Sequence, residues 1–128
     1  MSWDMRAWQE RLERLASPHP DSWAPAIDVY ETATAYVVTA EVPGVTREQI
    51  DLALEESRLT LRGQRTDRTT SGILHFHQVE RSHGSFARSF EFGQKIDVER
   101  VAADLAEGVL TITLPKVPPP PARRIQVK

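Results

Sequence analysis

The sequence predicts an all-β fold, an antiparallel β-sandwich with a short helical N-terminal arm and an extended C-terminal tail. Short apolar runs, several of them alternating with polar residues, recur between turn residues, and no helical pattern separates them. With 128 residues, 40% of them hydrophobic, the chain is long enough for one core. We expect an arm over residues 1–24, a sandwich over 25–116 and a tail over 117–128.

The arm begins with a predicted amphipathic helix over residues 1–16. A helix this short is marginal alone in water, so its apolar stripe needs a partner surface. The stripe either docks on its own domain or contacts other subunits and proteins. Residues 17–25 (SPHPDSWAP) are a linker by composition, and they contribute Trp23. The stripe lies at helical spacing and consists of Trp3, Trp8, Leu12 and Leu15.

Eight short segments of the sandwich are predicted strands. The alternation over residues 50–54 and 59–61 is typical of a strand with one buried face. Thr46 is a candidate cap for a single helical turn before the first of these. The predicted strands are residues 27–31, 35–42, 50–54, 59–61, 73–80, 86–92, 103–105 and 109–114.

The tail is a candidate anchor. Four prolines at 118–121 favour an extended helix of about 3.1 Å per residue, which makes a stiff spacer of roughly 12 Å. Ile125 and Val127 follow on one face of an extended strand, and burying both is worth roughly 3–6 kcal/mol before ordering costs. Such a contact is weak singly and strong when repeated across linked subunits. The alternative is a frayed terminus with two incidental aliphatic residues.

The composition argues against several classes of protein. A net charge of −2 and a pI near 6.1 give no basic excess for nucleic acid. The zero cysteines exclude disulfides, thiolate zinc sites and thiol nucleophiles, and they fit a reducing compartment. No window is long and apolar enough to span a bilayer, and residues 1–16 contain no signal core, so we expect a cytoplasmic protein with no membrane partner.

Catalytic and metal-binding motifs are not found. The glycines form no phosphate-binding loop, and no serine lies in a nucleophile elbow. His75 and His77 at i, i+2 can chelate, but without a third ligand we expect no metal and no cofactor. Histidines can change charge between pH 5 and 8, so this pair could instead shift a strand-mediated contact. The alternating carboxylates are expected to be solvated, and we expect no enzyme.

Several ordered motifs resemble the small heat-shock protein family, which carries the immunoglobulin-like α-crystallin domain. The resemblance covers about residues 25–127, and its first motif is the turn Val42-Pro43-Gly44-Val45. Residues 80–90 match the family's ER-x-x-G-x-F-x-R-x-F run, and residues 103–116 its A-x-x-x-x-GVL-T…PK signature. Ile125-Gln126-Val127 is similar to the C-terminal I-x-I/V anchor. Phe92-Gly93 replaces the frequent Leu-Pro, and Glu107 replaces the Asn that commonly precedes GVL.

The resemblance implies an ATP-independent holdase, a chaperone that binds partly unfolded clients and suppresses their aggregation. It implies a dimer building block within a larger homo-oligomer, in which the segment around residues 73–79 pairs with the partner's strand at residues 28–31. The expected exchange residues are Asp28, Val29, Tyr30, Glu31, Ile73, His75, His77, Val79 and Arg88. Arg88 is expected on the strand face opposite Phe86 and Phe90, in an interface ion pair with a carboxylate.

The resemblance also implies that Ile125 and Val127 enter a groove on a neighbouring subunit. The expected groove residues are Ile50, Leu52, Leu54, Ala103 and Leu105. Because clients share no sequence, their recognition should be hydrophobic and non-directional. The expected client-binding residues are Trp3, Trp8, Leu12, Leu15 and Trp23.

Three other functions remain open from the residues alone. A co-chaperone or adaptor on the same sandwich would act as a monomer and would not need the tail anchor. An adhesion or sugar-binding module is disfavoured because a Cys…Trp…Cys core is impossible here. An enzyme on a β-sandwich would need a nucleophile and base, and none can be named.

Overall fold

A computed structural model describes residues 23–66 and 71–128 of the chain. These residues form an all-β fold, as predicted; the helix expected over residues 1–16 lies outside them. The strands are β1 (Ile27–Glu31), β2 (Ala35–Glu41), β3 (Ile50–Glu55), β4 (Arg58–Arg65), β5 (Gly84–Glu91), β6 (Ala102–Ala106) and β7 (Val109–Pro115). Two single turns of 3-10 helix complete the list, η1 (Arg47–Gln49) and η2 (Val98–Arg100).

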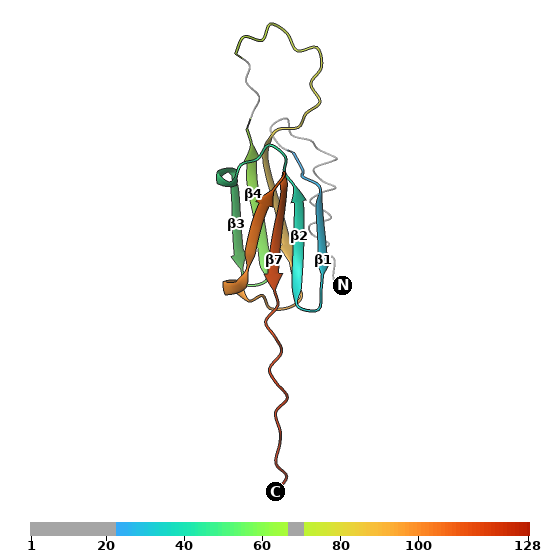
Figure 1. The fold of residues 1–128 in the computed structure, drawn as a ribbon, viewed down its shortest axis with the longest axis vertical. Coiled ribbons are helices and arrows are strands. Elements are labelled where there is room, and N and C mark those ends of the chain that lie inside the picture. Colours follow the sequence, from blue (N-terminus) through green and yellow to red (C-terminus); the bar gives the residue numbers. More distant parts are fainter. Residues whose placement is uncertain (1–22, 67–70) are drawn as a thin grey trace.

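The strands make two antiparallel sheets that pack face to face (Figure 1). One sheet has the order β1-β2-β7-β6 and the other the order β3-β4-β5. In the described part of the chain, β1 and β6 are the edges of the first sheet, and β3 and β5 those of the second. This arrangement brings β6 near β3, although some fifty residues separate them in sequence.

The core lies between the two sheets and follows the alternation of the sequence. In β7, buried and partly exposed residues alternate along the whole strand because successive side chains point to opposite faces. Strand β2 lies between β1 and β7, and five of its seven residues are buried; Tyr36, Val38 and Ala40 belong to the core cluster. The most deeply buried side chains are Val38, Val42, Leu59, Leu61, Ile112 and Leu114.

Residues 73–80 form no strand in this structure, so that prediction was wrong for the single chain. Together with residues 71, 72 and 81–83 they make an extended loop whose backbone joins no β-ladder among the described residues. A strand is stable only when a neighbour satisfies its backbone groups, and apolar alternation cannot show whether that neighbour lies in the same chain.

One tight turn and one close contact between a glycine and an aromatic ring constrain the backbone of the sandwich. Glu107 and Gly108 both have positive φ, 53° and 78°, and form the two-residue turn of the β6–β7 hairpin, a combination typical of a type I′ turn. At Gly63 a Cβ atom would lie 2.3 Å from Cζ of Phe86, so only glycine lets that ring cross the strand. Both positions are therefore constrained by backbone geometry more than by polarity.

Two segments project from opposite ends of the sandwich (Figure 1). The loop that contains residues 71–83 extends from the end where β4 finishes and β5 begins. The C-terminal tail leaves the other end after β7 and runs away from the sheets as an extended chain.

Candidate interaction surfaces

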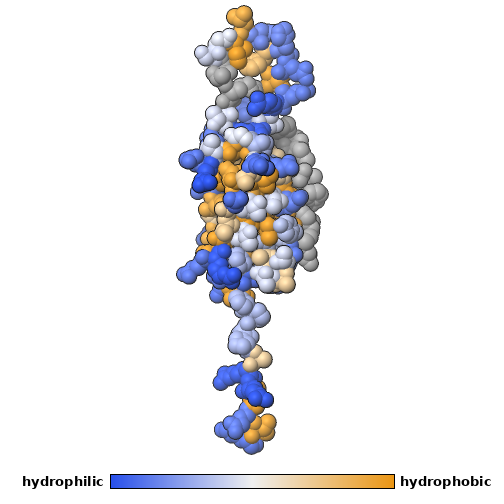
Figure 2. Space-filling model, in the orientation of Figure 1, coloured by the Kyte–Doolittle hydropathy of each residue, from blue (hydrophilic) through white to orange (hydrophobic). Residues whose placement is uncertain are grey.

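A groove lined by both aliphatic and charged side chains opens between β3 and β6, the edges of the two sheets. It has a volume of about 460 Å³ and is lined by Arg47, Ile50, Leu52, Ala103, Asp104, Leu105 and Leu110. Figure 2 shows hydrophobic residues gathered on this face of the sandwich. The structure thus brings together four of the five predicted groove residues.

Leu54, the fifth, packs partly buried against the core and does not line the groove. Three lining residues escaped the sequence analysis: Arg47, Asp104 and Leu110. Asp104 and Arg47 are polar residues, which an apolar pattern does not flag, and they lie beside groove residues only because an edge strand and a helical turn meet there. Leu110 lies in the predicted strand 109–114 and is deeply buried, at 3% exposure.

The predicted anchor residues are exposed on the tail. Ile125 and Val127 are 86% and 91% exposed, and hydrophobic residues are visible near the end of the extended segment (Figure 2). Their separation of two residues places both side chains on one side of an extended backbone. The tail runs away from the sheets, so these two side chains project from a segment that leaves the sandwich (Figure 1).

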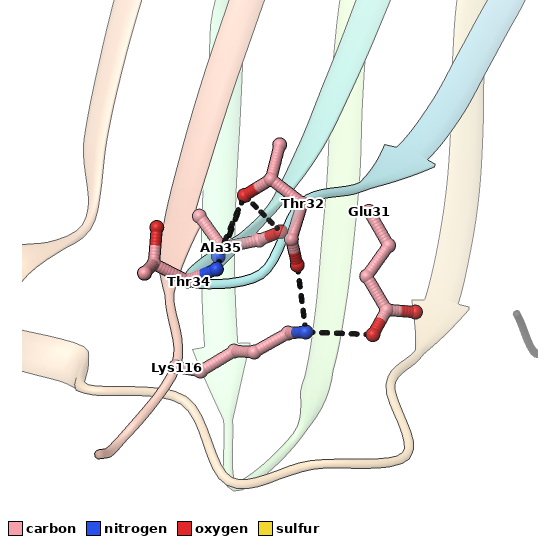
Figure 3. Close-up of polar contacts among 5 residues, drawn as sticks. All are labelled: Glu31, Thr32, Thr34, Ala35 and Lys116. Atoms are coloured by element: carbon pink, nitrogen blue, oxygen red, sulfur yellow. Dashed lines mark hydrogen bonds and ion pairs between the residues drawn. The ribbon is translucent and has the colours of Figure 1, made fainter.

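The base of the tail is held firmly. Nζ of Lys116 donates to Oε2 of Glu31 at 2.6 Å and to the carbonyl oxygen of Thr32 at 2.8 Å (Figure 3). The backbone N–H of Lys116 also donates to the carbonyl of Thr34, and that of Val117 to the carbonyl of Lys95. The tail therefore starts from a fixed point on the β1–β2 turn.

The loop exposes a second set of hydrophobic side chains. Its large exposed apolar residues are Ile73, Leu74, Phe76 and Val79. Leu74 and Phe76 were not predicted as contact residues, although their alternation with Ile73 and His75 was visible in the sequence. The rings of His75 and His77 meet edge to face with centres 5.0 Å apart.

Strand β1 carries the other predicted exchange residues. Asp28 and Tyr30 point outward and are exposed, whereas Val29 is half-buried and packs against the core. Glu31 is half-buried and bonded to Lys116. The structure does not bring the loop residues and β1 together within one chain.

The predicted face of Arg88 was wrong. Residues 86, 88 and 90 are two apart along β5, so they share one face, and Arg88 is 5% exposed between two buried phenylalanines. Its guanidinium lies 5.4 Å from the ring centre of Phe90. Among the described residues it is the one charged side chain classed as buried.

Trp23 lies in the core, contrary to the expected exposed position. It is 9% exposed, its Nε1 donates to the carbonyl of Gly84 at 3.0 Å, and its ring meets that of Phe86 edge to face. The linker-like composition of residues 17–25 does not predict this packing. The other predicted client residues, Trp3, Trp8, Leu12 and Leu15, lie outside the described residues.

Residues 23–66 and 71–128 hold no group of three or more His, Cys, Asp or Glu side chains placed to bind a metal ion. No helix in the same ranges is long and apolar enough to cross a membrane.

Family models, curated relatives and solved structures all point to the same protein family. The model of the Hsp20/alpha crystallin family matches residues 28–128. The chain is 41% identical over 108 residues to Spore protein SP21 of Stigmatella aurantiaca, an alignment that covers 84% of this chain and 64% of SP21. It is 34% identical to Small heat shock protein C4 of Rickettsia felis, covering 81% of this chain and 64% of that protein. The chain thus spans less than two thirds of the length of either relative.

Solved structures agree with the sequence matches. A small heat-shock protein from Xylella fastidiosa superposes with a TM-score of 0.72 at 33% identity, covering 83% of this chain and 97% of that one. Heat shock protein 16.0 from Schizosaccharomyces pombe gives 0.69 at 33% identity, covering 84% and 100%. The chain belongs to the Hsp20/alpha crystallin family, that of the small heat-shock proteins.

Proposed function

We propose that this protein is an ATP-independent holdase that binds partly unfolded proteins and keeps them from aggregating. One observation carries the proposal: the same chain has an open groove, most of whose lining residues are aliphatic, and an extended tail with two exposed aliphatic side chains that could pack against them. Family membership supports a chaperone role. A cytoplasmic location, with unfolded clients and copies of the same chain as partners, remains our prediction.

The tail of one subunit would occupy the groove of another. Two buried aliphatic side chains contribute roughly 3–6 kcal/mol before ordering costs, so one contact is reversible and several linked contacts are strong. The groove wall carries one carboxylate, Asp104, and one guanidinium, Arg47. Asp104 can pair with Arg123 or Arg124, which directly precede the anchor, while Arg47 opposes them and would favour a tail placed toward Asp104. The Xylella protein is described as having a distinct high order structure, which supports assembly by this family.

The loop would pair with β1 of a partner subunit. β1 lies at a sheet edge in the described part of the chain, and an edge strand accepts another extended segment through its backbone groups. Ile73, His75, His77 and Val79 alternate and so would share one face of the added strand. Arg88 remains a predicted contact of this interface.

Clients would bind to apolar surface that assembly covers. The groove becomes available when the tail leaves it, and the stripe of Trp3, Trp8, Leu12 and Leu15 is the second candidate. Trp23 could join them only after its packing against Phe86 opens. No step requires a nucleotide, because release of weak contacts by heat or dilution is sufficient.

Replacing both anchor residues tests the proposal. Ile125→Ala with Val127→Ala should reduce the native mass by light scattering to small species, mainly dimers. Gln126→Ala is the matched control, since that residue faces the other side of the tail, and it should leave the mass unchanged. Wild-type protein should also suppress aggregation of a heated client without ATP. A monomer that leaves the client to precipitate would instead indicate the adaptor alternative.

A further inference from the structure

Arg65 contacts three separate segments at the end of the sandwich that carries the loop. Its Nη1 donates to the carbonyl of Pro43 at 3.3 Å, and its Nη2 donates to the carbonyl of Ser82. Its guanidinium carbon lies 3.9 Å from the centre of the Trp23 ring. One side chain therefore joins the β2–β3 turn, the returning end of the loop and the segment that enters the sandwich from the arm.

The hydrogen bond from Arg65 to Ser82 joins the two ends of the loop. Arg65 is the last residue of β4 and pairs with Gly84, the first residue of β5. The loop begins after Arg65 and ends before Gly84. A second bond lies at the same neck, where Nε2 of Gln49 donates to Oγ1 of Thr66. The root of the projecting loop is therefore fixed by side chains from β4 and η1.

Trp23 is attached to the same root from the other side. Besides the bond from its Nε1 to Gly84, its backbone N–H donates to the carbonyl of Ser85 at 3.2 Å. Its ring packs on Phe86 with centres 5.1 Å apart. Trp23 thus caps the first residues of β5, while Arg65 covers its ring. The planar guanidinium of Arg65 stacks on the indole ring and donates to two carbonyl oxygens at the same time. The ammonium group of a lysine reproduces this combination of contacts poorly.

We propose that Arg65 is a positioning residue that couples the docking of Trp23 to the order of the loop root. When Trp23 leaves its site, Arg65 loses a supporting face and the contact with Ser82 loosens; when the loop root opens, Trp23 loosens in turn. The coupling is reciprocal because both contacts share one guanidinium. This rests on the proposed function in one respect: a client that pulls on the arm would thereby free the loop for exchange between subunits.

Arg65→Lys tests the coupling while keeping the charge. In a Trp3→Phe, Trp8→Phe background, where Trp23 is the one tryptophan, the variant should shift the emission to longer wavelength. Backbone amides of residues 82–86 should exchange hydrogen about tenfold faster, the effect expected for loss of a charge-assisted hydrogen bond. Arg58→Lys, at the other end of β4 in an ion pair with Glu91, should change neither. A folded Arg65→Lys protein with wild-type emission and exchange would overturn the proposal.

A second measurement separates coupling from simple loss of stability. Trp23→Leu should also speed exchange at residues 82–86, and the double variant with Arg65→Lys should be no faster than the faster single variant. Phe92→Leu is the control, because Phe92 is equally buried at 9% exposure but packs on Tyr36, away from the loop. Additive effects, or equal acceleration by Phe92→Leu, would refute the coupling. Both readouts are independent of chaperone activity, so they can fail while the proposed function holds.

Discussion

Lys116 lies with its Nζ 2.6 Å from Oε2 of Glu31, and this ion pair joins the end of β7 to the end of β1. The same nitrogen donates to the carbonyl oxygen of Thr32 (Figure 3). It also lies 5.0 Å from the ring centre of Tyr36. The side chain of Lys116 is 9% exposed, so the pair is more shielded from solvent than an ordinary surface ion pair. It secures the edge strand β1 at the point where the tail departs.

Lys116→Met should therefore lower the free energy of unfolding by about 2 kcal/mol, since it removes two charge-assisted hydrogen bonds and leaves a half-buried carboxylate. Urea unfolding followed by circular dichroism measures the change. Lys95→Met, at an exposed lysine near the same end of the sandwich, should change the midpoint little. Equal midpoints for the two variants would contradict a stabilising role for the pair.

Glu107→Asn should stabilise the protein. Glu107 has a φ of 53°, a left-handed conformation that asparagine adopts more readily than glutamate. We expect a gain of about 0.5–1 kcal/mol, or about 4 °C in the melting temperature. Glu99→Asn, on the exposed turn η2, should give no gain. The prediction fails if differential scanning calorimetry shows the same temperature for both variants.

Gly63→Ala should destabilise the sandwich by about 2–3 kcal/mol, because the new methyl group would overlap the buried ring of Phe86. Combining it with Phe86→Leu should recover part of the loss, since the smaller side chain vacates the space. A double-mutant cycle from urea unfolding measures the coupling. Strictly additive effects would show that the ring and the glycine are independent.

Ala103→Asp should weaken assembly without unfolding the subunit. Ala103 is exposed and lines the groove, so a carboxylate there would oppose burial of the apolar anchor. Ala102→Asp is the matched control, since it lies beside Ala103 on β6 and does not line the groove. Light scattering should show smaller particles only for Ala103→Asp. Adding Ile125→Ala with Val127→Ala should bring no further decrease.

Deleting residues 1–16 should reduce suppression of aggregation of a heated client while the β-type circular dichroism spectrum remains. The stripe within this segment is one of the two proposed client surfaces, and exposed apolar residues are what an unfolded client can bind. Replacing Trp3 and Trp8 by alanine should reproduce the loss, whereas alanines at Glu10 and Glu13 should not. Full protection by the deletion variant would leave the groove as the client surface.

Most of the fold could be predicted because its strands carry their own signal. The alternation at residues 50–54 and 109–114 identified β3 and β7 directly, and the turn residues marked their ends. The strand assigned to residues 73–80 carried the same signal but has no neighbour in its own chain. A local sequence pattern shows that a segment is suited to a β-strand. Only the topology shows whether a neighbouring strand is available to pair with it.

The contact surfaces were less predictable than the fold. Ile50, Leu52, Ala103 and Leu105 could be assigned to one groove through the family resemblance, while Arg47 and Asp104 joined it through the meeting of two edges. Arg65 gave no sequence signal because its partners include two backbone carbonyls, which any residue supplies. The prediction for Trp23 was wrong for a related reason. The composition of a linker does not show that one of its side chains packs into the folded domain.

The loop and the tail leave opposite ends of the sandwich, so in the proposed assembly each copy would bind a different neighbour at each end. Under the proposed contacts, a unit of this kind can be joined without limit, so a finite particle needs a fixed bend at every link. The stiff run at residues 118–121, which follows the contacts of Lys116, would set that bend. In the proposed assembly, a short rigid spacer outside the folded domain would determine whether the copies close into a shell or grow into a filament.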